Sequence, residues 1–176
     1  QIQFQSFSYI RYLYLDFKSH KMEIAKGIHA DEYLNLDLRD TTSPNWDIAF
    51  EYLRRRLTER FIEPTDKLIE LENHLQASDK KYGFSVLTID CLLTETLQAF
   101  YEGVTDSSGH SKRLFKTFLR QRDNFRDYFT DDQQATDFYT NFRCGILHQA
   151  QTSSDTKIWA TGKLIMRIGR FVIVNR

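Results

Sequence analysis

Arg143 and His148 are the two residues whose types and spacing point most directly to chemistry. They stand five positions apart near the end of an amphipathic stretch that begins at about Phe138. An arginine guanidinium can hold a phosphate through two parallel hydrogen bonds, and a histidine imidazole exchanges a proton near neutral pH. RNA carries its own nucleophile, the 2′-hydroxyl, so a protein that removes that proton and stabilises the phosphorane needs no metal ion. The pair therefore indicates metal-independent phosphodiester cleavage.

The spacing of Arg143 and His148 restricts how they could act together. On a regular α-helix, positions i and i+5 are about 140° apart around the axis, so the two side chains do not converge. They could be combined by a bend of the helix near Gly145, or by a second copy of the chain, because a two-fold dimer repeats one surface on both subunits. In the alternative interpretation, His148 is a solvated helix-end residue that interacts with terminal carbonyl groups.

Asp90 and Glu95 are unusual because the segment that contains them is apolar on nearly every side. Buried carboxylates require partners. We expect an ion pair inside the protein, in which Arg143 contacts Glu95 or Asp90. Such a pair is compatible with a catalytic arginine, since Glu95 would then orient its guanidinium.

A basic stretch lies between these two segments, with Lys112, Lys116 and Arg120 recurring every four residues on one face of a predicted helix. It could follow an RNA backbone, or it could be a solvated helix face. The net charge of the whole chain is zero, but residues 102–176 hold 12 Lys/Arg and 8 Asp/Glu, a balance of +4. An anionic partner should therefore prefer the C-terminal part. The Arg54–Arg56 run, which has acidic neighbours, is interpreted as surface.

The remaining reactive residue types do not form a familiar site. The other four histidines are scattered and show no metal-binding spacing, and the chain has no Gly-rich phosphate loop, so we expect neither a metal nor another cofactor. The two cysteines, Cys91 and Cys144, cannot build a disulfide framework and are interpreted as buried thiols in a reducing compartment. No apolar run reaches about 18 residues, so we expect a cytoplasmic protein that does not associate with membranes.

The elements that must position these residues are helices. Ser43 and Pro44 are typical of a helix start, and an apolar stripe then continues at helical spacing from Trp46 to about residue 77, with Pro64 kinking or restarting the helix. The apolar patterns that follow predict three more helices, over residues 82–101, over residues 111–126, and from Asp131 or Asp132 to Gln149. Residues 43–150 therefore predict an all-α fold, an antiparallel bundle of four to five helices.

The two ends of the chain are harder to assign to this bundle. Residues 1–42 form an N-terminal arm, with a period-two pattern over residues 7–17, or an extension introduced with expression, since the first methionine is Met22. Residues 151–176 form a C-terminal extension, in which the segments 158–161 and 171–174 predict a β-hairpin.

The motif Phe142-Arg143-Cys144-Gly145-Ile146-Leu147-His148 resembles the signature of the HEPN superfamily, an arginine followed after four to six residues by a histidine. The preceding apolar helix, with Asp90 and Glu95, also resembles the acidic helix of several such proteins. The resemblance covers roughly residues 44–150, and the chain is similar to bacterial HEPN proteins carried on plasmids and defence islands. The family often has Asn, Asp or His directly after the arginine, whereas this chain has Cys144, which puts an auxiliary polar role there in doubt.

The resemblance implies a hydrolase that cleaves RNA without a metal in the cleft of a homodimer and leaves a 2′,3′-cyclic phosphate. Arg143 would bind and polarise the scissile phosphate, and His148 would act as general base or acid. It also implies a toxin or antiviral role, with an antitoxin or defence-system protein as a further partner. Two alternatives stay open: a non-catalytic HEPN domain that binds RNA or acts as an adaptor, and an interaction module whose purpose is dimerisation.

Overall fold

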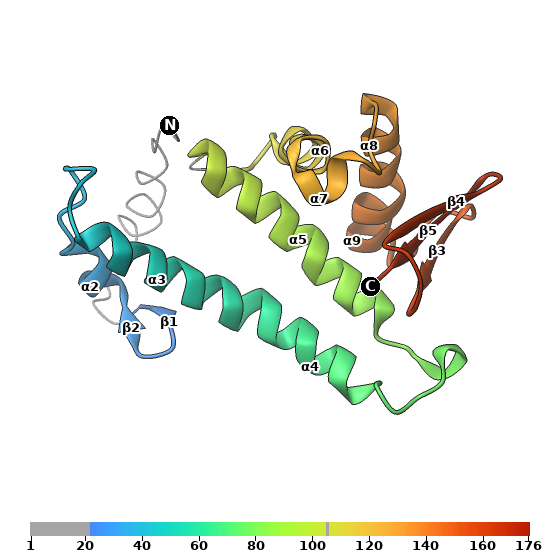
Figure 1. The fold of residues 1–176 in the computed structure, drawn as a ribbon, viewed down its shortest axis with the longest axis horizontal. Helices are drawn as coiled ribbons and strands as arrows, with labels where there is room; N and C mark the ends of the chain where they lie inside the picture. The colour runs from blue at the N-terminus through green and yellow to red at the C-terminus, as the bar shows by residue number, and fades with distance from the viewer. Residues whose placement is uncertain (1–21, 105) are drawn as a thin grey trace.

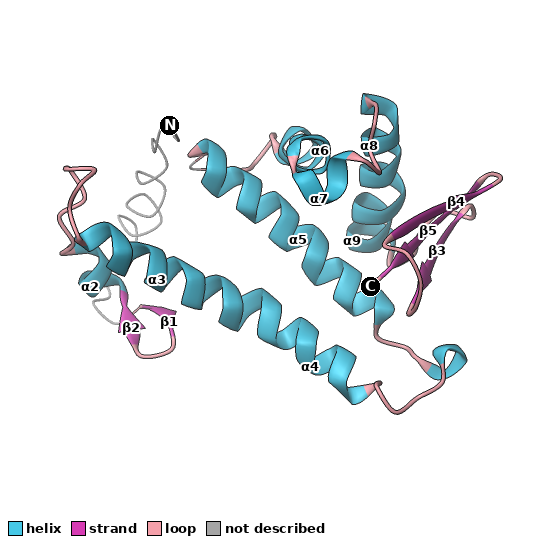
Figure 2. Ribbon diagram, viewed as in Figure 1, coloured by secondary structure: helices cyan, strands magenta, loops and turns pink. Residues whose placement is uncertain are grey.

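The computed structural model describes residues 22–104 and 106–176. The chain is mostly helical, but it also contains two small β-sheets, so the expected all-α architecture is correct only in its helical part (Figures 1 and 2). The period-two pattern over residues 7–17 lies outside the described residues. Across these two ranges, none of the helices combines the length and apolarity that a membrane crossing requires.

A long helical rod forms one side of the molecule and consists of α3 (Asn45–Leu57), a π-helical segment (Thr58–Ile62) and α4 (Glu63–Leu71). Ser43 Oγ accepts the backbone N–H of Asn45 at 3.3 Å, and Pro44 is the residue that directly precedes the helix, so the helix begins close to its predicted start. The wider π-turn lies directly before Pro64, which cannot donate a backbone hydrogen bond. The helix restarts there as predicted, although it ends at Leu71 and not near residue 77.

The described part of the segment before the rod, residues 22–44, is folded rather than an extended arm. Strands β1 (Glu23–Ala25) and β2 (Ile28–His29) form an antiparallel hairpin, and the short helix α2 (Ala30–Leu34) follows it. Ile24, Ile28 and Tyr33 pack with Ala49 of α3 in a small core. This packing attaches the hairpin to the first turns of the rod.

The arginine run on α3 does more than face solvent, which corrects the surface interpretation. Arg55 Nη2 donates to the carbonyl oxygen of Lys26 at 2.6 Å, and Arg56 Nη1 donates to that of Ile24 at 3.1 Å. Only Arg54 behaves as expected, in an exposed ion pair with Glu51. Two of the three arginines therefore fix the N-terminal hairpin to α3.

Helix α5 (Gly83–Glu102) lies in the middle of the molecule and runs antiparallel to the rod (Figure 1). Its nearly all-round apolar sequence suits this position, because neighbours contact it on more than one side. The helix expected over residues 111–126 is divided into α6 (Ser111–Gln121) and α7 (Asp123–Arg126), because Arg122 has an extended backbone conformation with ψ of 132°.

The last helical unit contains the predicted site. It consists of α8 (Asp132–Phe138), a π-helical segment (Tyr139–Cys144) and α9 (Gly145–Gln149). Asp131 begins α8 by accepting the backbone N–H of Gln134 at 2.8 Å. The unit packs beside α5 and α6.

The C-terminal residues form a three-stranded sheet and not a simple hairpin. Strands β3 (Thr156–Trp159) and β5 (Phe171–Asn175) pair in parallel, whereas β4 (Ile165–Ile168) pairs antiparallel with β5 at the centre. The hairpin therefore joins β4 to β5, and the strand β4 was not expected. Ile165 and Val174 pack in the same core as Leu87 and Phe115, so the sheet closes the core of α5 to α9.

Candidate functional site

The helix that carries Arg143 and His148 is irregular where the two residues lie. The backbone N–H of Gly145 donates to the carbonyl oxygen of Thr140, an i→i+5 bond that closes the π-helical segment before α9 begins. A π-turn contains more residues than an α-turn, so the separation calculated for a regular helix does not apply to this pair. The expected irregularity near Gly145 is therefore a π-turn that precedes this glycine.

Gly145 itself is required by the return of the chain after α9. A Cβ atom at this position would lie 2.6 Å from the backbone oxygen of Gln151, too close for any side chain. Ala150 adopts the left-handed conformation with φ of 53°, which lets the N–H of Gln151 donate back to the Gly145 carbonyl at 3.3 Å. The turn directly after His148 is thus held tightly against the start of α9.

Arg143 takes part in a polar cluster formed with Glu95, Ser111 and Tyr139. Arg143 Nη2 donates to Glu95 Oε2 at 2.9 Å, and the two side chains are only 14% and 11% exposed. Ser111 Oγ donates to the same Glu95 oxygen at 2.7 Å and lies 3.1 Å from the Tyr139 hydroxyl. The guanidinium also lies over the Tyr139 ring, 5.4 Å from its centroid. This arrangement confirms the expected pairing of Arg143 with Glu95.

The electrostatics of the polar cluster keep the arginine charged. Burial alone would lower the pKa of Arg143, but the Glu95 carboxylate beside it outweighs burial and raises the pKa above its usual value. Burial raises the pKa of the Tyr139 hydroxyl, so this group stays protonated at neutral pH. Arg143 Nε is buried and has no hydrogen-bond partner in the described part of the chain. The guanidinium is therefore oriented by Glu95 while a donor remains unused.

His148 lies apart from the polar cluster in a single copy of the chain. It is an exposed residue in α9, the short helix that follows the π-turn. No hydrogen bond or ion pair joins it to Arg143 among the described residues, and it lines neither of the two apolar hollows beside α5. One chain alone therefore does not bring the two motif residues into direct contact.

Asp90 does not share the environment of Glu95. In the described part of the chain its carboxylate accepts no hydrogen bond and forms no ion pair, and Arg143 contacts Glu95 instead. Burial raises the pKa of Asp90 to about 6. Of the two acids expected as partners of the arginine, Glu95 contacts it and Asp90 does not.

The basic residues of α6 are largely matched by acids from neighbouring helices. Lys116 Nζ lies 2.6 Å from Asp132, and Arg120 lies 3.8 Å from the same carboxylate. Lys112 stands one turn earlier and is exposed. Of the three predicted RNA-binding residues, Lys112 is therefore the one that has no ion-pair partner among the described residues.

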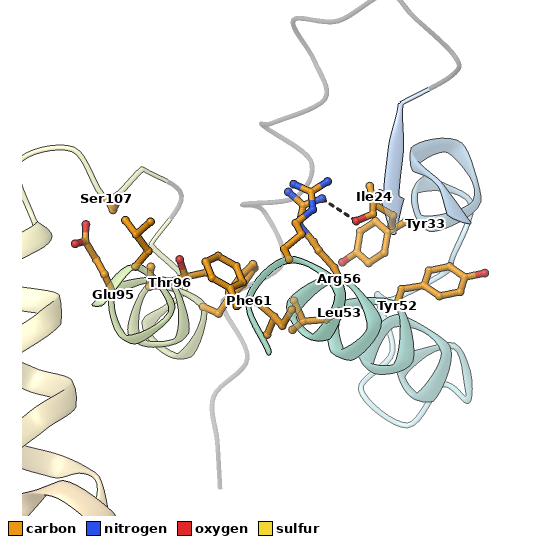
Figure 3. A pocket seen from close by; sticks show the side chains of 14 residues that line it. Ile24, Tyr33, Tyr52, Leu53, Arg56, Phe61, Glu95, Thr96 and Ser107 are labelled. Carbon is orange, nitrogen blue, oxygen red and sulfur yellow. Dashed lines mark hydrogen bonds between the residues drawn. The ribbon is translucent and has the colours of Figure 1, made fainter. Parts of the chain in front are cut away.

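A groove between the rod and α5 reaches the polar cluster (Figure 3). Its volume is about 360 Å³, and Glu95 and Ser107 line one end of it. Arg56 and Arg60 line the opposite wall, where Arg56 donates to the Ile24 carbonyl (Figure 3). The groove thus places two cations across from the carboxylate that holds Arg143.

Several of these residues were not predicted from the sequence. Ser111 and Tyr139 join the polar cluster from positions 16 and 44 residues after Glu95, and no local spacing connects them. Arg56 and Arg60 were visible only as a charged helix face. Among the described residues, no three His, Cys, Asp or Glu side chains gather in a way that could hold a metal ion.

Comparisons with family models, with curated proteins and with solved structures find no match to this chain. Its function is therefore inferred from its own residues.

Proposed function

We propose that the chain is a HEPN-type endoribonuclease that cleaves RNA without a metal ion and acts as a homodimer. Arg143 binds the scissile phosphate and stabilises the charge that develops on it. His148 takes the proton of the attacking 2′-hydroxyl or returns a proton to the leaving oxygen. The products are a 2′,3′-cyclic phosphate and a 5′-hydroxyl.

The proposal rests on the surroundings and the hydrogen bonding of the Arg143 guanidinium. Its guanidinium is oriented by Glu95, is mostly shielded from solvent and keeps a buried N–H without a partner. Buried polar groups are nearly always satisfied, so an unpaired donor on an oriented cation indicates a missing acceptor. A phosphate oxygen is such an acceptor, and an arginine fixed before binding loses less entropy when it binds.

The exposed position of His148 favours a site shared between two copies. Arg143 and His148 do not contact each other in one chain, and the π-turn together with the tight cap at Ala150 fixes the backbone on both sides of the histidine. A two-fold axis near α9 would place His148 of one copy opposite Arg143 of the other. The spacing of the motif allowed either a bend near Gly145 or a second copy of the chain, and the proposed arrangement is the second of these.

Purified protein incubated with labelled single-stranded RNA tests the proposal. The wild-type chain is expected to release cyclic-phosphate ends in the presence of EDTA. His148→Ala should abolish cleavage without changing the thermal midpoint, because the side chain is exposed. Arg143→Lys is a better companion than Arg143→Ala, since it keeps a cation beside Glu95 but loses the planar fork. Cleavage that persists in both variants would remove the proposal, and RNA binding without cleavage would favour the adaptor alternative.

Mixing the two inactive variants tests whether the site is shared. If Arg143 and His148 act across the dimer, a mixed dimer of His148→Ala and Arg143→Lys chains contains one intact site out of two. Random exchange makes half of the dimers mixed, so about a quarter of the wild-type activity should return. If both residues act within one chain, mixing should restore nothing.

A further inference from the structure

A second hollow, separate from the groove and from the polar cluster, lies between α5, α6 and the C-terminal sheet. We call it the apolar cavity; it has a volume of about 290 Å³ and is lined by Leu87, Asp90, Leu97, Phe118, Ile165 and Asn175, together with further apolar side chains. Small-molecule sites begin at about 300 Å³ and combine apolar walls with a few polar groups. The apolar cavity has this composition at the lower end of that size range.

Two hydrogen-bond acceptors in the apolar cavity have no donor. The Asp90 carboxylate accepts no hydrogen bond in the described part of the chain, and the Thr94 hydroxyl donates to the backbone oxygen of Asp90 and not to its side chain. Asn175 donates through Nδ2 to the Gly162 carbonyl at 2.6 Å, which leaves its buried Oδ1 without a partner. The two acceptors come from α5 and β5, so the fold and not local sequence brings them to one cavity.

The walls of the apolar cavity offer no strong hydrogen-bond donor to these two acceptors. The Thr94 hydroxyl lines it, but this group donates to the Asp90 carbonyl oxygen at 2.7 Å. The Cys91 thiol also lines it, and burial raises the pKa of this thiol to about 12, so it adds no charge. An ionised carboxylate among apolar side chains is costly unless a cation or donors accompany it.

We propose that the apolar cavity binds a small organic cation that carries a primary ammonium group on an apolar body. The ammonium would donate to the Asp90 carboxylate and to Asn175 Oδ1, because it offers three donors and no acceptor. The apolar body would lie among Leu87, Leu97 and Phe118. Leu164, which also lines the cavity, is exposed. The inference does not depend on the ribonuclease proposal, since none of these residues belongs to the polar cluster.

Calorimetric titration of the full chain with phenethylamine and with phenethyl alcohol tests this inference. The two probes have the same shape and differ in the ammonium, so the amine is expected to bind at least about tenfold more tightly. Asp90→Asn should weaken amine binding by at least about tenfold and leave the alcohol unchanged. Asp66→Asn is the matched control, because it makes the same substitution on an exposed face of α4, and it should change neither affinity.

The results that would overturn the inference are equally specific. Equal affinity for the amine and the alcohol would overturn it, as would no binding of the amine at concentrations up to roughly 10 mM. An amine affinity that Asp90→Asn does not change would overturn it as well. Asn175→Leu gives an independent check, since it removes the second acceptor, and it should weaken amine binding while the alcohol binds as before.

Discussion

The raised pKa of the Asp90 carboxyl predicts how the stability of the protein changes with pH, and this prediction can be tested without an assay of function. The pKa of its carboxyl is raised by burial from 3.8 to about 6 in the folded protein. The folded state therefore binds this proton more tightly than the unfolded state. The contribution of Asp90 to stability is fully present below about pH 3.8 and is lost as the pH rises through about 6.

The magnitude follows from the two pKa values. At pH 7 the ionised carboxylate lowers the free energy of unfolding by roughly 3 kcal/mol relative to a neutral side chain, and at pH 4 by only about 0.5 kcal/mol. Asp90→Asn supplies a neutral side chain of nearly the same shape. The variant should therefore be more stable than the wild type at pH 7, with a thermal midpoint higher by about 6–12 °C for a chain of this size. This gain should almost disappear at pH 4.

Denaturant unfolding of both proteins between pH 4 and pH 7.5, followed by circular dichroism, measures this difference directly. The comparison across pH is the decisive quantity, because the fixed cost of placing an amide in the apolar cavity cancels from it. Asp66→Asn serves again as the control and should shift stability by less than about 0.5 kcal/mol at every pH. A difference between Asp90→Asn and wild type that is the same at pH 4 and pH 7 would refute the reasoning.

Three further predictions concern the site helix and can be checked by thermal and denaturant unfolding. Gly145→Ala should destabilise the protein by about 2–3 kcal/mol. The new Cβ would lie 2.6 Å from the Gln151 carbonyl oxygen, and neither atom can move away without a shift of the backbone. Ala150→Gly should instead stabilise it by roughly 0.5–1 kcal/mol by relieving the left-handed conformation at φ of 53°, and a loss of stability would contradict that view. Arg143→Ala should cost roughly 3 kcal/mol because it leaves Glu95 shielded and unpaired, whereas Arg143→Lys should cost less than half as much; equal losses would mean that the ion pair does not matter.

The long helices could be predicted from the sequence because apolar residues recur along them at helical spacing. The helix expected over residues 82–101 is α5 at Gly83–Glu102, since a segment that is apolar on all sides has to be central. The sheet could not be predicted to the same degree. The parallel pairing of β3 with β5 depends on contacts between distant residues, and β4 is too short to show a period. The one local signal was Gly169-Arg170, a two-residue turn with φ of 58° at the glycine, which is typical of a hairpin between the strands on either side.

Of the contacts in the polar cluster, only the ion pair between Arg143 and Glu95 could be predicted from the sequence. Arg143 and Glu95 are charged residues on largely apolar helices. A buried charge requires a partner of opposite charge, so the two residues could be expected to pair. The roles of Ser111 and Tyr139 depend on how α6 and the last helical unit pack against α5, which no spacing reveals. A bend near Gly145 was one of two possibilities that the motif spacing suggested, but its form as a π-turn could not be predicted, because no glycine or proline lies within Tyr139–Cys144.

Asp90 and Glu95 show why burial alone does not reveal what a charged residue does. Both lie on α5, and five positions on a regular helix turn them about 140° apart, so they face different neighbours. Glu95 receives two hydrogen bonds on one oxygen, from Arg143 and Ser111, and its charge is therefore compensated inside the protein. Asp90 faces apolar side chains and the unpaired oxygen of Asn175, so its charge opposes folding at neutral pH. Two carboxylates on the same helix thus differ: Glu95 orients the arginine, whereas Asp90 has no cation beside it among the described residues.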